Sequence, residues 1–509
     1  MIAAAAVLLD LGRLHRFEWG DSLVPVLVSL QRWTPFYWDQ ERYGMLVPLL
    51  AAPVRDPLWN LLLQRLLLTL AGLGAVVLLA RHVLAGRDWP LAGALAVAGL
   101  LAAAPPTWLF EYCFDQPYGL SLALAAAGLA AAEAGAAGRR SWPRVAAGAL
   151  LVGLAHWVNA ATGVLLAALA VARAAVDRRE GEPSSTPRAR LAWDLGLLAI
   201  GLAAGQGLMR LAPPSAGPFR ADASPLPPGA LPAAWAKLLG NAWRESGHWP
   251  TALAATAAAG LLLLALPPAR AHLRGALWRA GALVAAAVAW ALFVGSLRWV
   301  QSNWSHWRYL APSAVLLQLA AASLVAEPLA RLRRAARPAG LAALALVPAA
   351  ALASGTPSFA RVRADLDAAT GRLTGALLAG RCDVVAGSYW TVWPAVWHAA
   401  LVLHERGDGR RVYGVAHRAT PTLGAWRDRG GVTVCRAAGE KAYADRWLRE
   451  LGLPPMRAAR QVGNVEVLEP DPAGGDRAAA DAEIEWPPRW WWGRSPVPAG
   501  APSWPGDDP

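Results

Sequence analysis

The chain has 509 residues, of which 56% are hydrophobic and only 16% are charged. Soluble globular domains carry about 25% charged residues, so this composition excludes both an ordinary soluble enzyme and a disordered chain. The formal net charge is +13, but lysine occurs only at Lys237 and Lys441. The remaining positive charges are arginines in short clusters between apolar runs, which is typical of topology signals rather than of nucleic-acid binding. The 27 tryptophans also fit many passages through a bilayer interface.

Apolar runs close to the ~20 residues needed to cross a bilayer recur along the first two-thirds of the chain. Residues 145–172 form a split run whose halves are each too short to span, which favours a re-entrant-like helical hairpin. Counting both halves, we predict an all-α polytopic membrane domain over residues 1–356 with about eleven segments. The other expected crossings lie at 1–17, 58–80, 90–108, 119–137, 191–211, 251–267, 280–300, 310–327 and 339–355.

Basic residues predict the orientation of these segments. One set of alternating loops contains 17 Arg and Lys in 56 residues, whereas the opposite set contains 7 in 98. The first set is expected to be cytoplasmic, because cytoplasmic loops carry the excess of Arg and Lys. The alternation requires that 145–172 returns to the side from which it starts. We therefore expect a protein of a bacterial-type cytoplasmic membrane. The basic loops are 81–89, 139–144, 173–190, 267–279 and 329–338, and the opposite loops are 18–57, 109–118, 212–250 and 301–309.

The first expected crossing is unusual, because Asp10, Arg13 and His15 interrupt it. No basic region precedes the apolar run and no small-residue cleavage site follows it, so a signal peptide is disfavoured. We expect instead that the reading frame extends upstream and adds apolar residues to this segment.

The composition changes after residue 356. Strand-like runs alternate with helix-like runs over residues 357–470, which predicts a small α/β domain, extracytoplasmic by the topology above. Cys382 and Cys435 are either bridged in that compartment or remain as buried thiols. Residues 471–509 are rich in Pro, Gly, Asp and Trp and are interpreted as a disordered or membrane-surface tail.

Acidic residues in the first extracytoplasmic loop are the main candidates for chemistry. Asp21, Asp39 and Glu41 lie in an aromatic-rich stretch rather than in a Gly/Ser-rich one. Such carboxylates at headgroup depth would lie where a lipid-linked phosphate meets a water-soluble acceptor, although most loop acids are merely solvated. Apolar residues in the same loop have helical spacing, which predicts an amphipathic helix on the outer leaflet: Leu23, Val26, Leu27 and Leu30.

Two further outer loops contribute candidates for substrate binding. The short loop 109–118 holds Glu111 and Asp115. Capping of the following helix is an equally good explanation of Asp115. Arg308, beside His306 and Tyr309, presents a planar fork of donors suited to phosphate, and interfacial anchoring is the alternative.

The remaining motifs either have an ordinary structural explanation or are absent from the sequence. His156, Asn159 and Thr162 occupy the hairpin tip, where a polar turn must satisfy its own backbone groups. The sequence has no Walker loop, no GxGxxG followed by an acid, no HExxH and no GxSxG elbow. Charges do not cluster at the middle of the predicted helices, which disfavours a proton or ion relay.

The segments WDQERYG at 38–44 and HWRYLAP at 306–312 resemble motifs of the GT-C superfamily of integral-membrane glycosyltransferases. The first is similar to a D-E-x-R-Y stretch and the second to an R-Y-x-x-P helix start in lipid-A- and protein-modifying members. The hairpin and the short acidic loop also have counterparts there. The resemblance covers roughly residues 1–356, and it departs from the family where Gln40 separates the paired acids and where Asp21 competes for the same role.

This resemblance implies an enzyme that moves a sugar from a polyprenyl-phosphate carrier to an extracytoplasmic glycan, lipid or protein. A loop carboxylate, Asp39 before Asp21 or Glu41, would act as general base. Arg308, with His306 nearby, would stabilise the negative charge that develops on the leaving phosphate. The resemblance specifies no cofactor, and whether a divalent Mg²⁺ or Mn²⁺ held by Asp21, Asp39 and Asp115 assists is left open.

Two other classes remain as alternatives. One is a polytopic transporter or lipid flippase, which internal repeats or mid-membrane ion pairs would favour. The other is a non-catalytic cell-envelope assembly protein that keeps the same fold.

Overall fold

The computed structural model describes most of the chain outside several loops and the C-terminal tail. The described residues are 1–12, 14–38, 43–84, 89–115, 117–137, 142–179, 185–210, 224–270, 272–331, 333–353, 355–416, 432–450 and 455–471. The expected tail at 471–509 therefore lies outside them beyond residue 471.

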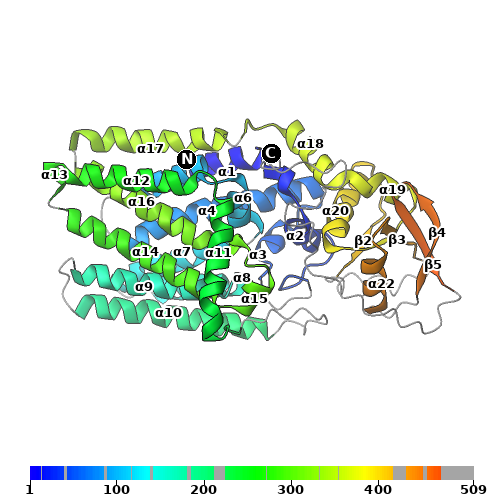
Figure 1. Ribbon diagram of the computed structural model, residues 1–509, viewed down its shortest axis with the longest axis horizontal. Helices are drawn as coiled ribbons and strands as arrows, with labels where there is room; N and C mark the ends of the chain where they lie inside the picture. Colours follow the sequence, from blue (N-terminus) through cyan, green and yellow to red (C-terminus); the bar gives the residue numbers. More distant parts are fainter. Residues whose placement is uncertain are drawn as a thin grey trace.

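Long helices form one end of the molecule and a small sheet with its helices forms the other (Figure 1). The long helices are α4 (Pro57–Val83), α5 (Trp89–Ala103), α7 (Tyr118–Ala137), α8 (Trp142–Val158), α9 (Thr162–Arg179), α10 (Ser185–Met209), α12 (Trp249–Ala265), α14 (Leu273–Gly295), α16 (Ala311–Arg331) and α17 (Arg333–Ala353). They lie roughly parallel to one another in Figure 1.

Short helical elements fill the region between the bundle and the sheet. They are α1 (Ile2–Asp10), η1 (Leu14–Phe17), α2 (Gly20–Leu30), α3 (Leu46–Ala51), α6 (Pro106–Phe110), the π-helix η2 (Glu111–Asp115), η3 (Pro228–Ala230), α11 (Leu231–Glu245), α15 (Arg298–Ser302) and η4 (Trp307–Leu310). A further short helix, α13 (Pro267–Arg270), follows α12 at the far end of the bundle (Figure 1).

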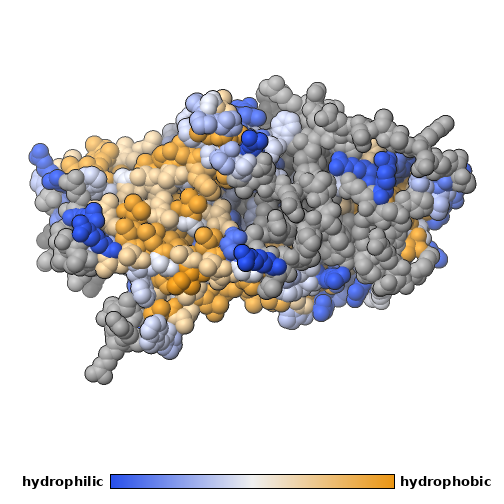
Figure 2. Space-filling view, turned by 90° about the horizontal axis from the view of Figure 1, so that it is seen from below, coloured by the Kyte–Doolittle hydropathy of each residue, from blue (hydrophilic) through white to orange (hydrophobic). Residues whose placement is uncertain are grey.

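Among the described residues, four helices are long and apolar enough to cross a membrane: Pro57–Val83, Pro187–Leu208, Leu273–Gly295 and Trp307–Arg331. A fifth is reached if Pro228–Glu245 and Trp249–Ala265, which meet at 88°, count as one broken span. These helices coincide with five of the expected crossings. Figure 2 shows a broad hydrophobic surface over the helical end, with hydrophilic residues at its far edge and toward the sheet. The chain thus has the helices of a membrane protein, with four or five candidate spans.

The split run at 145–172 forms two consecutive helices, α8 and α9, that are joined at residues 159–161. They contain 17 and 18 residues, which at 1.5 Å per residue gives each helix a length of about 26 Å. Each helix is longer than its apolar run, because polar and basic residues continue the helix at the end away from the turn at 159–161. A hairpin of this length still returns the chain to the side from which it starts.

The first expected crossing is shorter than predicted. α1 contains only nine residues and ends at Asp10, after which the chain turns through η1 into α2. A nine-residue helix has a length of about 14 Å and cannot span a bilayer. α1 packs instead against α4 and α17.

The C-terminal part is a five-stranded mixed sheet with the strand order β2-β1-β3-β5-β4. β1 pairs in parallel with β2 and β3, whereas β5 pairs antiparallel with β3 and β4. The strands are β1 (Val384–Ala386), β2 (Tyr413–Val415), β3 (Val434–Ala437), β4 (Met456–Val462) and β5 (Val465–Pro470). The helices of this part are α18 (Phe359–Thr370), η5 (Gly371–Leu373), α19 (Thr374–Ala379), α20 (Tyr389–Glu405) and α22 (Lys441–Glu450).

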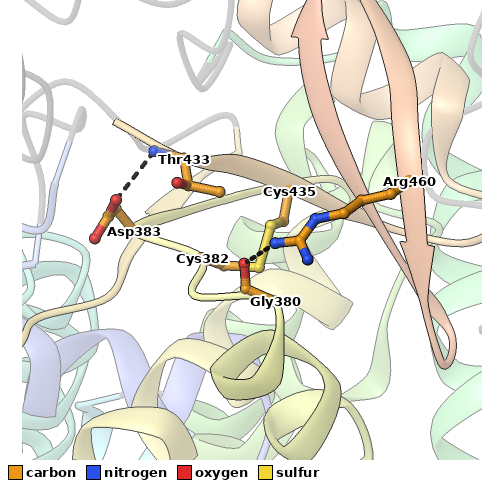
Figure 3. The surroundings of a disulfide bond; sticks show 6 residues. All are labelled: Gly380, Cys382, Asp383, Thr433, Cys435 and Arg460. Atoms are coloured by element: carbon orange, nitrogen blue, oxygen red, sulfur yellow. Dashed lines mark hydrogen bonds between the residues drawn. A yellow bond between two sulfur atoms is a disulfide. The ribbon is translucent and has the colours of Figure 1, made fainter. Parts of the chain in front are cut away.

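The expected α/β pattern is therefore present. The predicted strand runs correspond to β1, β2, β3 and β5 and the helix runs to α20 and α22, whereas β4 was not predicted. Cys382 and Cys435 form a disulfide between the start of β1 and β3 (Figure 3). Nearby, Arg460 of β4 donates a hydrogen bond to the Gly380 carbonyl over 3.1 Å.

α2 joins the two ends of the molecule. Its apolar residues Leu23, Val26 and Leu27 are buried in one core with Trp393 of α20. The expectation that this face lies on the outer leaflet is therefore wrong. Helical spacing reveals that a face is buried but not what covers it, and here the cover is the C-terminal domain.

Candidate functional site

The carboxylate of Asp21 is the centre of a polar cluster where helices, loops and the C-terminal domain meet. The Tyr389 hydroxyl donates a hydrogen bond to Asp21 Oδ1 over 2.7 Å. A guanidinium nitrogen of Arg308 lies 3.6 Å from Asp21 Oδ2. The Tyr37 hydroxyl lies 2.6 Å from that of Tyr389 and bonds the Asp21 carbonyl over 3.3 Å. Side chains from three parts of the sequence thus meet around Asp21.

The start of α2 places Asp21 in this cluster. The Trp19 amide donates to the Ser22 hydroxyl over 3.0 Å and caps the helix. Asp21 therefore lies in the first turn, where the helix dipole favours a negative charge. A Cβ atom at Gly20 would lie 2.5 Å from the Tyr389 ring, so glycine is needed there for the tyrosine to reach Asp21.

A buried ion pair between Arg65 and Glu18 supports the first turn of α2. Arg65 of α4 donates hydrogen bonds to both carboxylate oxygens of Glu18, over 2.8 and 2.5 Å. The Ser22 hydroxyl also bonds Glu18, over 2.6 Å, and the Ser22 carbonyl accepts from Arg65. The guanidinium lies 4.7 Å from the ring centroid of Phe114. This pair connects α4 to the first turn of α2.

Arg308 is held by a tight turn. Trp304 and Ser305 have φ values of 60° and 53°, a region that side chains other than glycine seldom adopt. The Asn241 amide of α11 donates to both of their carbonyls, over 3.1 and 2.9 Å. The Arg308 amide then donates to Nδ1 of His306 over 3.2 Å. This network fixes the backbone that presents Arg308 to Asp21.

His306 and Tyr309 have structural contacts of their own. His306 lies just before the candidate span Trp307–Arg331, where burial and then the neighbouring Arg308 lower its pKa well below the usual value. With Nδ1 accepting from an amide, its proton lies on Nε2. The Tyr309 hydroxyl accepts from Asn303 over 2.5 Å, and its carbonyl accepts from Trp290 over 2.8 Å.

Glu111 belongs to the same neighbourhood. Its side chain is buried at 1% exposure in η2. Tyr118, at the start of α7, interacts electrostatically with Tyr43, Glu111, Arg308 and Tyr309. The second outer loop and the 300–312 segment are thus brought together around Tyr118.

Asp115 is the last residue of η2, but its side chain lies outside the described residues. Asp39 and Glu41 also lie outside them, whereas both flanks of that segment are described. Trp38 packs against Trp393 of α20 with ring centroids 5.6 Å apart. The Tyr37 amide donates to the Tyr43 carbonyl over 3.1 Å.

The possible metal site of Asp21, Asp39 and Asp115 is not tested, because Asp39 and the Asp115 side chain lie outside the described residues. No group of three or more His, Cys, Asp or Glu side chains within the described part of the chain is arranged to hold a metal ion. Asp21 itself contacts Arg308 and Tyr389. No step is therefore assigned to a metal.

The hairpin tip between α8 and α9 has structural contacts. The Asn159 side chain accepts a hydrogen bond from the Ala161 amide over 3.2 Å. The Thr162 hydroxyl lies 2.7 Å from that of Ser121 on α7. Both contacts agree with a polar turn that satisfies its own groups.

A second ionic cluster lies inside the helical bundle, which the sequence did not lead us to expect. Arg173 of α9 bonds Glu133 of α7 and donates to Nδ1 of His82 over 2.9 Å. His82 Nε2 lies 4.0 Å from a carboxylate oxygen of Asp194 on α10. Within the described structure, neither oxygen of the buried Asp194 carboxylate has a hydrogen-bond partner. Arg190 also pairs with Asp177.

Sequence reasoning missed three parts of the Asp21 cluster: Tyr389, Tyr37 and the Glu18–Arg65 pair. Tyr389 belongs to the C-terminal domain, 368 residues from Asp21, and no local pattern connects the two. Arg65 did give a signal, because an arginine in an apolar run at 58–80 requires a buried partner.

Comparisons with known proteins return no relatives. Neither a scan against protein-family models nor a search of curated proteins finds a match to this chain.

Proposed function

We propose that this protein is a membrane glycosyltransferase that moves a sugar from a polyprenyl-phosphate carrier to an extracytoplasmic glycan, lipid or protein. One observation carries the proposal. Arg308 pairs with Asp21, which also accepts a hydrogen bond from Tyr389, at the junction of the helical bundle and the C-terminal domain. An arginine fork next to apolar helices suits a lipid phosphate, and an adjoining domain suits a water-soluble acceptor.

In this mechanism Arg308 binds the leaving phosphate and offsets the charge that develops on its oxygens. Asp21 orients the guanidinium, because it already lies 3.6 Å from it and accepts from Tyr389. Asp39 is the proposed general base, which takes a proton from the acceptor hydroxyl or amine as it attacks the anomeric carbon. Trp38 and Tyr43, on either side of the acidic segment, both lie close to this cluster.

The proposed topology keeps the orientation expected from the sequence, with an extracytoplasmic C-terminal domain. The asymmetry of the arginine-rich loops supports this orientation. The disulfide between Cys382 and Cys435 supports it independently, because disulfides persist mainly in oxidising compartments.

The test is transfer of a radiolabelled sugar from polyprenyl phosphate by membranes that contain matched amounts of each variant. Asp39→Asn should lose about 100-fold or more in turnover, the usual contribution of a general base. Asp21→Asn should be milder, and Arg308→Ala should mainly raise the donor concentration that is needed. Arg457→Ala, which changes an exposed arginine on the edge strand β4, is the matched control.

The outcomes separate the roles. If Asp39→Asn retains transfer while Asp21→Asn is inactive, Asp21 is the base. If neither variant changes transfer from any polyprenyl-phosphate sugar, the protein is not this enzyme.

A transporter is the second candidate, and the cluster of His82, Arg173 and Asp194 is the observation that favours it. The cluster lies toward the expected cytoplasmic end of the bundle, because His82 and Arg173 fall in the basic loops 81–89 and 173–190. Buried ionisable side chains of membrane proteins often mark ion or proton pathways. In this case Asp194→Asn would abolish uptake or efflux by proteoliposomes. The glycosyltransferase proposal expects instead that Asp194→Asn leaves sugar transfer unchanged in the fraction that folds.

A further inference from the structure

α11 differs from every long helix of the bundle in its direction. It meets α12 at 88°, and Figure 1 shows it running roughly perpendicular to the long helices. If α12 follows the membrane normal, α11 lies in the membrane plane. Lys237 and Arg244 on α11 also argue against its placement in the hydrocarbon core.

The side chains of α11 fall into three faces. Ala234, Leu238 and Ala242 are buried against the protein. Leu239 and Trp243 form an apolar stripe that is 54% and 71% exposed.

Lys237 and Arg244 lie seven residues apart and so share a third, basic face. At 100° per residue, this face is turned by about 130° from the stripe. A helix with an apolar stripe beside a basic face is typical of binding at a bilayer surface.

α11 is also connected to the Asp21 cluster. Asn241 donates to the carbonyls of Trp304 and Ser305, the two residues with positive φ that precede Arg308. Arg244 in turn donates to the Asn241 side-chain oxygen over 2.5 Å.

We propose that α11 is an interfacial helix that binds the lipid bilayer through Leu239 and Trp243, and that Asn241 thereby fixes the Arg308 turn at headgroup depth. The apolar stripe inserts among the acyl chains, while Lys237 and Arg244 face the lipid phosphates. Asn241 is a positioning residue. The role of Asn241 toward the lipid-linked donor rests on the proposed function, whereas the contact of α11 with the bilayer does not.

The neighbouring helix α12 favours a lipid bilayer as the surface that covers the apolar stripe of α11. α12 follows α11 after a short break and exposes apolar side chains along its length: Ala254, Ala255, Ala258, Ala259, Leu261 and, at its far end, Leu262, which is 73% exposed. A bilayer that covers these side chains reaches the stripe of α11 without a gap. A second copy of the chain would instead have to cover one part of a continuous apolar surface and also leave the basic face in water.

The first experiment measures the depth of nitroxide labels in the full chain, reconstituted in phosphatidylcholine–phosphatidylglycerol vesicles. Cysteines replace Leu239 and, as the matched control, Lys237; Leu262→Cys serves as the lipid-embedded reference. Oxygen should relax the label at 239 more strongly than a water-soluble nickel chelate does, as at 262. The chelate should dominate at 237.

Two results would overturn the lipid contact. Equal access of the chelate to 237 and 239 would mean that water covers the stripe. Protection of 239 from both relaxing agents would mean that protein covers it, as in a dimer. Both labelled positions are exposed, so size-exclusion chromatography should show folded protein in each case.

The second experiment tests the link to the turn by hydrogen exchange of residues 300–306 in the same vesicles. Asn241→Ala removes two hydrogen bonds and should accelerate exchange about tenfold, whereas Lys237→Ala should not. Unchanged exchange in Asn241→Ala would overturn the positioning role. Neither experiment measures sugar transfer, so their failure is distinguishable from failure of the proposed function.

Discussion

The buried ion pair between Glu18 and Arg65 supports the Asp21 cluster although it does not contact Asp21 itself. Arg65 and Glu18 are fully paired in the interior, and their shared contact with Ser22 holds the first turn of α2. Removing one partner would leave an uncompensated charge in an apolar region. The cost of that change exceeds the net value of the pair itself.

Arg65→Met should therefore lower the free energy of unfolding by about 3–5 kcal/mol. The measurement is thermal unfolding of the purified protein in detergent. The double variant Glu18→Gln, Arg65→Met is the control, and it should recover part of the loss because residue 18 then no longer carries a buried charge without its arginine partner. Equal losses in the single and double variants would contradict the explanation.

Close approach of neighbouring helices depends on a few small residues. Gly128 of α7 and Gly148 of α8 face each other, and a Cβ at Gly148 would lie 2.6 Å from the Gly128 carbonyl. Small residues at such crossings let membrane helices pack backbone to backbone.

Gly148→Leu should push α7 and α8 apart and destabilise the protein by at least about 1–3 kcal/mol. Gly281→Leu on α14 is the matched control, since a Cβ there meets nothing within 4 Å. Fluorescence-detected size-exclusion chromatography after heating compares the two. A similar midpoint for both variants would mean that the α7–α8 contact is not tight.

The disulfide fastens a different element, the centre of the sheet. Cys382 and Cys435 are 53 residues apart in sequence, and closing a loop of that length stabilises the folded chain by about 4 kcal/mol on the chain-entropy estimate.

Cys382→Ser should lower the unfolding temperature of the C-terminal domain, and Cys382→Ser, Cys435→Ser should behave alike. A reducing agent should lower the midpoint of the wild-type protein and leave the double variant unchanged. A wild-type midpoint that is insensitive to reduction would show that the bridge is absent from the native protein.

The visible face of the molecule is hydrophobic over much of its helical end and carries hydrophilic patches toward the sheet (Figure 2). The proposed topology predicts that reporter fusions after Ser388 and after Ala335 report opposite compartments, with Ser388 outside the cytoplasm. Paired alkaline phosphatase and green fluorescent protein fusions at each position make the measurement. A cytoplasmic signal after Ser388 would invert the placement of the Asp21 cluster and of α11.

Periodic and compositional features of this protein could be predicted from the sequence. The apolar runs predicted the helices α4, α10, α14 and α16 because a membrane helix satisfies all its backbone hydrogen bonds within one segment. Alternating runs predicted β1, β2, β3 and β5 for a similar local reason. The exposed, basic strand β4 has no apolar alternation and escaped prediction.

Only the tertiary structure decided which faces and charges meet. α2 has the helical spacing of a surface helix, yet its apolar side is covered by α20. Asp21 was a candidate by residue type, but its partners Arg308 and Tyr389 come from segments 287 and 368 residues away. Local sequence determines periodicity and therefore secondary structure. Long-range packing determines which side chains share an environment, and no short pattern encodes it.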